Sequence, residues 1–118
     1  MAEQIMITIV DDEQDMRESI SQWLSLSGYK TVTYASADLA LKNIDLDYPG
    51  IIISDIKMPG TDGISFLKKL QKIDNALPVI LITGHGDVSM AVEAMRIGAY
   101  DFLEKPFNPE RMAELAKR

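Results

Sequence analysis

Short apolar runs alternate with longer amphipathic stretches along the chain, and this alternation is the feature that most restricts its fold. The runs are rich in isoleucine, valine and threonine, and they have the length and β-branched character of strands. They cover residues 5–10, 30–34, 51–54, 79–83 and 101–104. Because several runs are too apolar to leave one face of a sheet in water, we expect a parallel sheet covered on both faces. The predicted fold class is therefore α/β, a doubly wound five-stranded sheet with right-handed crossovers.

The stretches between these runs carry helix signals. The first has apolar residues at the spacing of one helical stripe, which would place Trp23 in the core: Met16, Ile20, Trp23 and Leu24. Gly28 follows this stripe and suits a left-handed C-cap. Four later helices have N-cap residues at their expected starts: Ser36, Asp62, Asp87 and Asn108. The last of these helices is short, so we expect the chain to be a fragment of a longer protein.

Composition excludes several classes of function. The chain has 118 residues, which is the size of one domain with one core. It has 18 acidic and 12 basic residues, so it lacks the positive field that sequence-independent binding to nucleic acid needs. It has no cysteine, which excludes disulfides and thiolate metal sites. Without a basic leader or an apolar run of ~20 residues, the sequence predicts a soluble cytoplasmic protein with no membrane segment.

Polar residues gather where the predicted strands end. In open parallel sheets, ligands bind outside the carboxyl ends of the strands. The residues expected there are Asp11, Asp12, Asp55, Thr83 and Lys105. Each close pair of carboxylates costs roughly 4 kcal/mol at an effective dielectric of 20, so a hard divalent cation is expected among them, and Mg²⁺ fits best. Thr83 and Lys105 supply a hydroxyl and a charge that can hold phosphate oxygens.

Each of these residues also has a simpler interpretation. Asp12 can cap the first helix, and Asp55 can be a turn residue before Pro59-Gly60. Lys105 can be a solvated charge, and Thr83 an ordinary strand residue. Their joint occurrence at four strand ends favours a functional site over four separate structural roles.

The same residues resemble the receiver domain of two-component response regulators. The resemblance covers residues 1–118 and rests on four motifs: Asp11-Asp12, Asp55 with Met58-Pro59-Gly60, Thr83-Gly84, and Lys105-Pro106-Phe107. The segment LITGHGDVSMAVEAMRIGAYDFLEKPF is most similar to receivers of the C4-dicarboxylate transport and nitrogen regulation type, whose output is a sigma-54-dependent ATPase. It is also similar to nitrogen-fixation regulators with a helix-turn-helix output.

The resemblance implies a flavodoxin-like fold with strand order 2-1-3-4-5 and a phosphorylated site. Asp55 would accept a phosphoryl group from the phosphohistidine of a sensor histidine kinase. Asp12, Asp55 and the backbone carbonyl of Lys57 would bind Mg²⁺, with Asp11 acting mostly through a metal-bound water. Lys105 would pair with the phosphate. The domain would not be an enzyme, apart from Mg²⁺-dependent self-phosphorylation and autodephosphorylation.

The resemblance also implies a conformational switch and a dimer. Thr83 would move toward the phosphate, and Phe102 would rotate inward behind it. The Lys105–Pro106 peptide bond would be cis. Lys57 and His85 stand at positions that tune the lifetime of the phosphoryl group, although an ordinary loop residue is the simpler interpretation of His85. A phosphorylation-linked homodimer would use the fourth helix, fifth strand and fifth helix, and DNA would be bound only through a C-terminal output domain.

Other functions remain open at this point. The receiver could stand alone, or it could be a pseudo-receiver that binds partners without phosphorylation. A phosphohydrolase of the dehalogenase type needs a second acid two residues after its nucleophile, where this chain has Lys57. A dinucleotide or flavin site is disfavoured because no glycine-rich loop follows the first strand.

Overall fold

Strands and helices alternate through the described chain. The computed structural model describes residues 6–44, 48, 50–84, 88–105 and 110–112. In chain order the elements are β1 (Met6–Val10), α1 (Gln14–Leu26), β2 (Lys30–Tyr34), α2 (Ala37–Leu41), β3 (Gly50–Asp55), α3 (Gly63–Ile73), β4 (Val79–Thr83), α4 (Val88–Ile97) and β5 (Asp101–Glu104). The strands form one parallel sheet in the order β2-β1-β3-β4-β5. The predicted fold class and strand order are confirmed.

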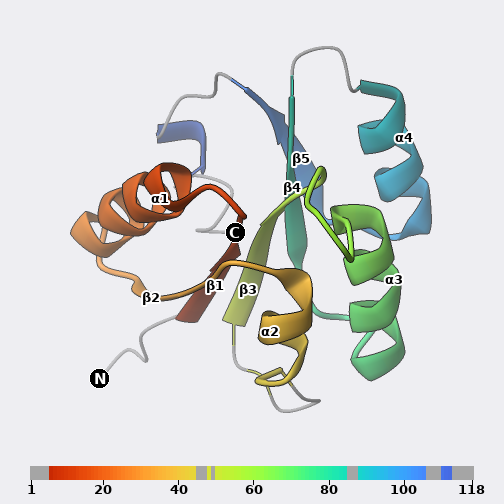
Figure 1. Ribbon diagram of the computed structural model, residues 1–118, viewed down its shortest axis with the longest axis horizontal. Helices are drawn as coiled ribbons and strands as arrows, with labels where there is room; N and C mark the ends of the chain where they lie inside the picture. The colour runs from red at the N-terminus through yellow and green to blue at the C-terminus, as the bar shows by residue number, and fades with distance from the viewer. Residues whose placement is uncertain (1–5, 45–47, 49, 85–87, 106–109, 113–118) are drawn as a thin grey trace.

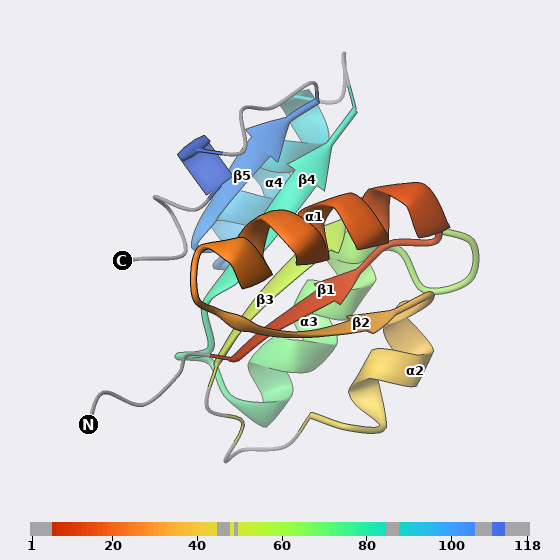
Figure 2. The same ribbon diagram turned by 90° about the vertical axis from the view of Figure 1, so that its left-hand side faces the viewer.

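Helices cover both faces of this sheet. Figures 1 and 2 show α1 across one face and α3 and α4 on the other, and α2 lies on the α3 side, where it packs against α3, β1 and β2. The α1-side core contains Ile7, Ile9, Ile20, Leu24, Ile51, Ile53, Ile80, Ile82, Leu103 and Met112. The α3-side core contains Val10, Ala37, Ala40, Ile44, Ile52, Ile56, Met58, Phe66, Leu67, Leu70, Leu77, Val79, Leu81, Ala94 and Ala99.

Strand alternation sends neighbouring side chains into these two cores. Ile52 and Ile53 are both 0% exposed, and they belong to opposite cores. Full burial of one such side chain contributes roughly 1.5–3 kcal/mol. The central strands are therefore apolar on both faces, as a covered parallel sheet requires. Of the buried polar residues that the structure describes, Thr8 and Ser54 lie within strands, whereas Asp11, Asp55 and Thr83 lie at strand ends.

Three of the predicted helix boundaries are confirmed. Gly28 follows α1 with φ +97°, a left-handed conformation that glycine adopts without strain. The Ser36 hydroxyl accepts a hydrogen bond from the Leu39 amide at 3.2 Å, at the start of α2. Asp62 Oδ1 accepts one from the Ser65 amide at 2.8 Å, at the start of α3.

The prediction that Trp23 lies in the core is wrong. Its side chain is 36% exposed, whereas Ile20 and Leu24 on the same helix are buried. Trp23 projects roughly 80° from the midpoint of those two residues, at the margin of the apolar stripe. The caps predicted at Asp87 and Asn108 lie outside the described residues, and residues 110–112 are helical. None of the described helices has both the length and the apolar character needed to cross a bilayer.

Candidate functional site

Three carboxylates meet at the carboxyl edge of the sheet. Asp11 and Asp12 follow β1, and Asp55 is the last residue of the neighbouring strand β3. One carboxylate oxygen from each lies within 4.8 Å of the others. Asp11 and Asp55 are 1% and 5% exposed, whereas Asp12 is exposed to solvent. The structure thus brings together the three acidic residues that the sequence placed at these strand ends.

Asp11 is held at three points. Its amide donates to the Tyr34 carbonyl at 3.2 Å, and its Oδ1 accepts from the Glu13 amide at 2.9 Å. Its backbone carbonyl accepts from Arg17 Nη1 at 2.7 Å. Asp11 Oδ2 is buried and has no hydrogen-bond partner among the described residues. One oxygen of this carboxylate therefore fixes the turn, and the other is left for a ligand.

Burial raises the pKa of Asp11 to about 6. The Glu13 amide and Lys105 oppose this rise, while the neighbouring carboxylates of Asp55 and Asp12 add to it. A buried carboxylate beside like charges favours its neutral form, because burial removes the hydration that stabilises its charge and its neighbours repel it. A cation bound at Oδ2 would reverse that preference.

Asp55 has a positive partner. Lys105, directly after β5, places its Nζ 3.3 Å from Asp55 Oδ2. Burial raises the pKa of Asp55, and the charge and hydrogen bond of Lys105 oppose the rise, together with the Ile56 and Lys57 amides. Lys105 is 23% exposed at its side chain, so the ion pair lies at the surface of the site rather than in the core. The amine can follow a group added to this carboxylate.

Thr83 lies at the end of β4, beside the strand that carries Asp55. The residue before it, Ile82, pairs with Asp55, and the Thr83 carbonyl accepts from the Lys105 amide at 2.8 Å. The Thr83 hydroxyl is fully buried and lacks a hydrogen-bond partner among the described residues. Phe102 on β5 is half-buried and packs against the α3-side core. A buried hydroxyl without a partner is costly, which makes Thr83 ready to bond a new acceptor.

The loop between β3 and α3 passes close to the phosphoacceptor candidate. A Cβ on Gly63 would lie 2.5 Å from the Asp55 carbonyl oxygen and 2.6 Å from Ile56 Cα, so only glycine fits this approach. The Gly63 amide donates to the Ile56 carbonyl at 2.7 Å. Thr61 in the same loop donates to Asp38 Oδ1 at 2.8 Å, which ties the loop to α2.

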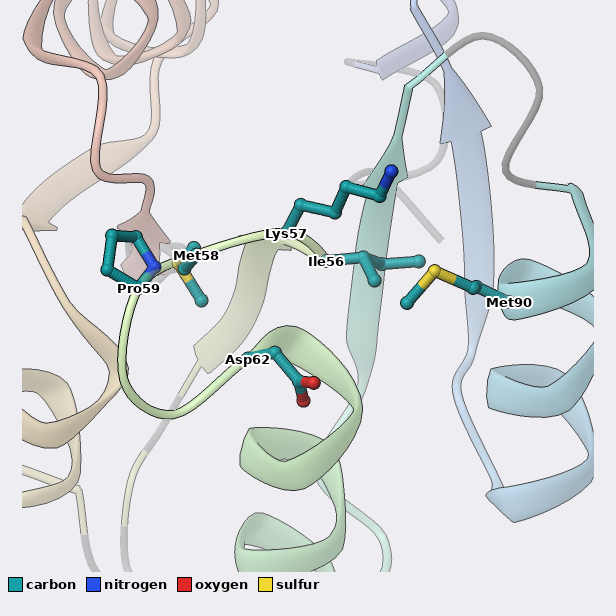
Figure 3. A pocket seen from close by; sticks show the side chains of 6 residues that line it. All are labelled: Ile56, Lys57, Met58, Pro59, Asp62 and Met90. Carbon is teal, nitrogen blue, oxygen red and sulfur yellow. The ribbon is translucent and has the colours of Figure 1, made fainter.

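A hollow of about 410 Å³ lies beside this loop. Figure 3 shows its lining, which consists of Ile56, Lys57, Met58, Pro59, Asp62 and Met90. Met90 of α4 and Ile56 point toward each other across it, while Lys57 extends toward the end of β4. Apolar and charged side chains both line the hollow, which lies between α4 and the loop that follows Asp55.

The donor set fits a hard divalent cation. Carboxylate oxygens are the ligands that Mg²⁺ prefers, and two of the three acidic side chains are buried enough to need a counterion. Asp11 Oδ2, which is buried and has no hydrogen-bond partner in the part of the chain that the structure describes, is the atom that a cation or its water would contact. Lys57, whose carbonyl would be a further ligand according to the family resemblance, stands two residues after Asp55 in the adjoining loop.

Two residues named from the sequence lie outside the described residues: His85 and Pro106. The predicted cis bond before Pro106 and the predicted role of His85 therefore stay predictions.

Sequence reasoning missed the supports of the acidic turn. Neither the bond from the Glu13 amide to Asp11 nor the bond from Arg17 to the Asp11 carbonyl was foreseen. The first had a signal, because an aspartate often accepts from the amide two residues later. The second had none, because an arginine in the first turn of a helix is usually a surface residue.

Comparisons with known proteins identify the family. The model of the response regulator receiver domain matches residues 7–117. The chain is 46% identical over 112 residues to the C4-dicarboxylate transport transcriptional regulatory protein DctD of Rhizobium meliloti, covering 95% of this chain and 24% of that protein. It is 39% identical over 109 residues to the transcriptional regulatory protein FixJ of Bradyrhizobium diazoefficiens, covering 92% of this chain and 53% of that protein.

A solved structure agrees with these relatives. The receiver domain of NtrX from Brucella abortus superimposes with a TM-score of 0.90 at 42% identity, covering 95% of each chain. The chain spans about a quarter to a half of the length of the curated relatives named above. The fold, the grouped strand-end residues and these likenesses agree, and the chain belongs to the response regulator receiver domain family.

Proposed function

We propose that this domain is a phosphorylation-activated switch in which Asp55 accepts a phosphoryl group from the phosphohistidine of a sensor histidine kinase. The observation that carries the proposal is the pairing of Lys105 with Asp55 at 3.3 Å, next to two further carboxylates, in a chain of the receiver family. This arrangement supplies a nucleophile, a cation and metal ligands at one point. No other described part of the chain joins these three elements.

The chemical step is an in-line displacement at phosphorus. A carboxylate oxygen of Asp55 forms a bond to phosphorus as the P–N bond to the kinase imidazole breaks, and the electron pair returns to that nitrogen. Lys105 stays with the oxygens of the transferred group, where it neutralises charge. The ion pair seen before transfer therefore keeps the amine close to the place where charge increases.

The acidic residues are proposed to hold Mg²⁺. Asp12, Asp55 and the Lys57 carbonyl would bind the ion directly, and Asp11 would act mostly through a bound water. When bound, the cation neutralises the oxygens of the phosphoryl group during transfer. The residues of the chain orient Asp55, and the positive charge of Lys105 opposes the rise in the Asp55 pKa that burial causes.

Phosphorylation is proposed to change the α3-side face through Thr83. The modified aspartate carries a charge near −2 and offers new acceptors, and the buried Thr83 hydroxyl lacks a partner. A shift of Thr83 toward the phosphoryl group opens space on the same face, where Phe102 packs half-buried. Inward rotation of Phe102 would carry the signal to β5. Shifting such a two-state equilibrium from 1:99 to 99:1 takes about 5.5 kcal/mol, which a few charge-assisted hydrogen bonds can supply.

The output is proposed to lie in a C-terminal domain of a longer protein. The likeness to DctD supports a sigma-54-dependent ATPase, and the likeness to FixJ supports a helix-turn-helix domain as the alternative. DNA would be bound only through that domain. Exposed apolar side chains on α4 and after it, Val92, Met95 and Tyr100, support a phosphorylation-linked homodimer on this face.

The lifetime of the phosphoryl group is proposed to depend on Lys57 and His85. Lys57 stands two residues after the acceptor, and His85 two residues after Thr83. Side chains at these places can admit or block the water that hydrolyses the acyl phosphate. Equal dephosphorylation rates for the parent and His85→Ala would remove His85 from this role.

Intact-protein mass spectrometry tests the proposal. We expect incubation with acetyl phosphate and Mg²⁺ to add one phosphoryl group to the parent and to an Asp74→Asn control, which alters a half-buried aspartate at the far end of α3. The Asp55→Asn variant should gain none, because its amide is a poor nucleophile. No gain in the parent from acetyl phosphate or from a phosphorylated kinase, with the domain folded, would contradict the proposal and favour a pseudo-receiver.

A further inference from the structure

The backbone carbonyl of Asp11 receives a hydrogen bond from a side chain that the phosphoryl chemistry does not use. Arg17, in the first turns of α1, donates from Nη1 to this carbonyl at 2.7 Å, and the residue is half-buried. The carbonyl belongs to the peptide unit that joins Asp11 to Asp12. A fixed orientation of this unit therefore sets the directions in which both acidic side chains leave the chain.

Arg17 donates to a neutral carbonyl oxygen, although the carboxylates of Asp11 and Asp12 belong to the same turn. A guanidinium beside acidic residues usually pairs with a carboxylate, which gains more from its charge. Here the bond goes to a carbonyl, and Asp11 Oδ2 keeps no hydrogen-bond partner among the described residues. Arg17 thus stiffens the turn without occupying the oxygen that a cation would need.

Two further hydrogen bonds hold Asp11 in this turn. The Asp11 amide is bonded to Tyr34 on β2, and Oδ1 to the Glu13 amide. With Arg17 on the carbonyl, the amide, the side chain and the carbonyl of Asp11 are each bonded to a different residue, one on β2 and two at the start of α1. Removing Arg17 frees the carbonyl alone, so the turn can rotate about its two remaining supports.

We propose that Arg17 is a positioning residue for divalent-cation binding, and that it favours Mg²⁺ over Ca²⁺ by holding the Asp11–Asp12 turn rigid. The inference rests on the proposed function, because it takes the three carboxylates as the cation site. Mg²⁺ needs near-octahedral ligands at short distances, whereas Ca²⁺ accepts flexible geometry and longer bonds. Loss of rigidity therefore weakens the binding of the smaller ion more.

Charge alone predicts the opposite result. Arg17 is a cation next to an acidic cluster, so it repels a divalent ion, and its removal should tighten binding if Coulomb forces decide. If positioning decides, its removal should weaken binding. The sign of the change thus separates the two roles.

Isothermal titration calorimetry of the 118-residue chain with Mg²⁺ and with Ca²⁺ tests this inference. The variant is Arg17→Met, which keeps an unbranched apolar stem and good helix propensity but removes the donor. The matched control is Arg96→Met, which removes the same charge from an exposed position on α4. We expect Mg²⁺ to bind Arg17→Met about tenfold more weakly than the parent, as for loss of other outer-shell supports. Ca²⁺ affinity should fall less, and the control should match the parent.

A second readout separates positioning from simple stabilisation. The ¹⁵N–¹H signal of Glu13 reports the bond from its amide to Asp11, and Mg²⁺ should shift it in the parent. In Arg17→Met without metal, we expect this signal to move or broaden at temperatures where the melting curve shows a fully folded domain. An unchanged signal together with unchanged or tighter Mg²⁺ binding would overturn the inference.

The proposed function fails in a different way. If the parent and Asp12→Asn bind Mg²⁺ equally weakly, the carboxylates are not the cation site, and both proposals fall. If the parent binds Mg²⁺, Asp12→Asn loses it and Arg17→Met does not, the cation site stands and the role of Arg17 is wrong.

Discussion

The two faces of the sheet differ in the chemistry that they bury. The described part of the α1-side core is built from isoleucine, leucine and methionine, and by strand alternation the carboxylates of Asp11 and Asp55 continue the same face. The buried hydroxyls, Thr8, Ser54 and Thr83, alternate with those residues and face the α3 side. One face thus carries the carboxylates of the proposed reaction site, above an aliphatic core. The other carries groups whose hydrogen bonds can be rearranged.

The hydroxyls on the α3 side are not equivalent. Thr8 is hydrogen-bonded to the Tyr48 hydroxyl, and Ser54 donates to the Asp55 carbonyl at 3.0 Å. Thr83 alone among these three lacks a hydrogen-bond partner within the described residues. Half-buried, adaptable side chains such as Met90 and Phe102 also pack on this side. The difference between the faces suggests that the aliphatic face fixes the reaction site, while the α3-side face responds to it.

The largest expected effect concerns the reacting face. Without metal, Asp11→Asn should raise the free energy of unfolding at pH 7.5 by roughly 3 kcal/mol at most, because it removes a buried carboxylate whose folded pKa is about 6. In the parent, the folded state holds this proton more tightly than the unfolded state. The stabilisation that protonated Asp11 contributes to the folded state is therefore fully present below pH 3.8 and is lost as the pH rises to about 6.

Urea unfolding of both proteins at several pH values in EDTA measures this difference. Because the pKa of Asp55 is also raised, Asp55 makes the unfolding free energy of both proteins fall as the pH rises. Saturating Mg²⁺ should raise the unfolding free energy of the parent more than that of Asp11→Asn. Equal pH profiles for the two proteins without metal would show that the Asp11 carboxylate is not destabilised by its surroundings.

Smaller changes in the unfolding free energy, opposite in sign to each other, are expected for two threonines on the α3-side face. Thr83→Val should raise the unfolding free energy of the unphosphorylated domain by about 1 kcal/mol, because it replaces a buried hydroxyl without a partner by a methyl group. Thr8→Val should lower it by a similar amount, because it leaves the Tyr48 hydroxyl without its partner. Chemical denaturation measures both, and the same sign for the two variants would break the distinction between these hydroxyls.

Much of this organisation could be predicted from the sequence. The strand runs and the caps at Ser36 and Asp62 follow from local patterns, because hydrophobic periodicity and capping chemistry act over a few residues. The parallel sheet follows from the alternation of strands and helices, whereas the strand order came from the family resemblance. The meeting of Asp11, Asp12 and Asp55 follows from topology, since neighbouring parallel strands end at the same edge.

The remaining features depend on contacts that no local pattern encodes. Trp23 lies at the margin of its helical stripe, and its exposure is set by how α1 is rotated on the sheet. The bond from Arg17 to Asp11 and the pair of Thr8 with Tyr48 need the full three-dimensional arrangement, because each joins segments through a single side-chain orientation. The missing partner of Thr83 can be seen only once every neighbouring donor and acceptor has been placed.

Amide hydrogen exchange with and without a phosphoryl group on Asp55 tests the contrast between the faces most directly. Beryllium fluoride with Mg²⁺ can serve as a stable mimic of the modified carboxylate, and Asp55→Asn treated in the same way is the control. We predict that exchange rates change in β4, α4 and β5, and that the amides of α1 keep their rates. Changes confined to α1, or equal changes on both faces, would contradict the account in which one face reacts and the other responds.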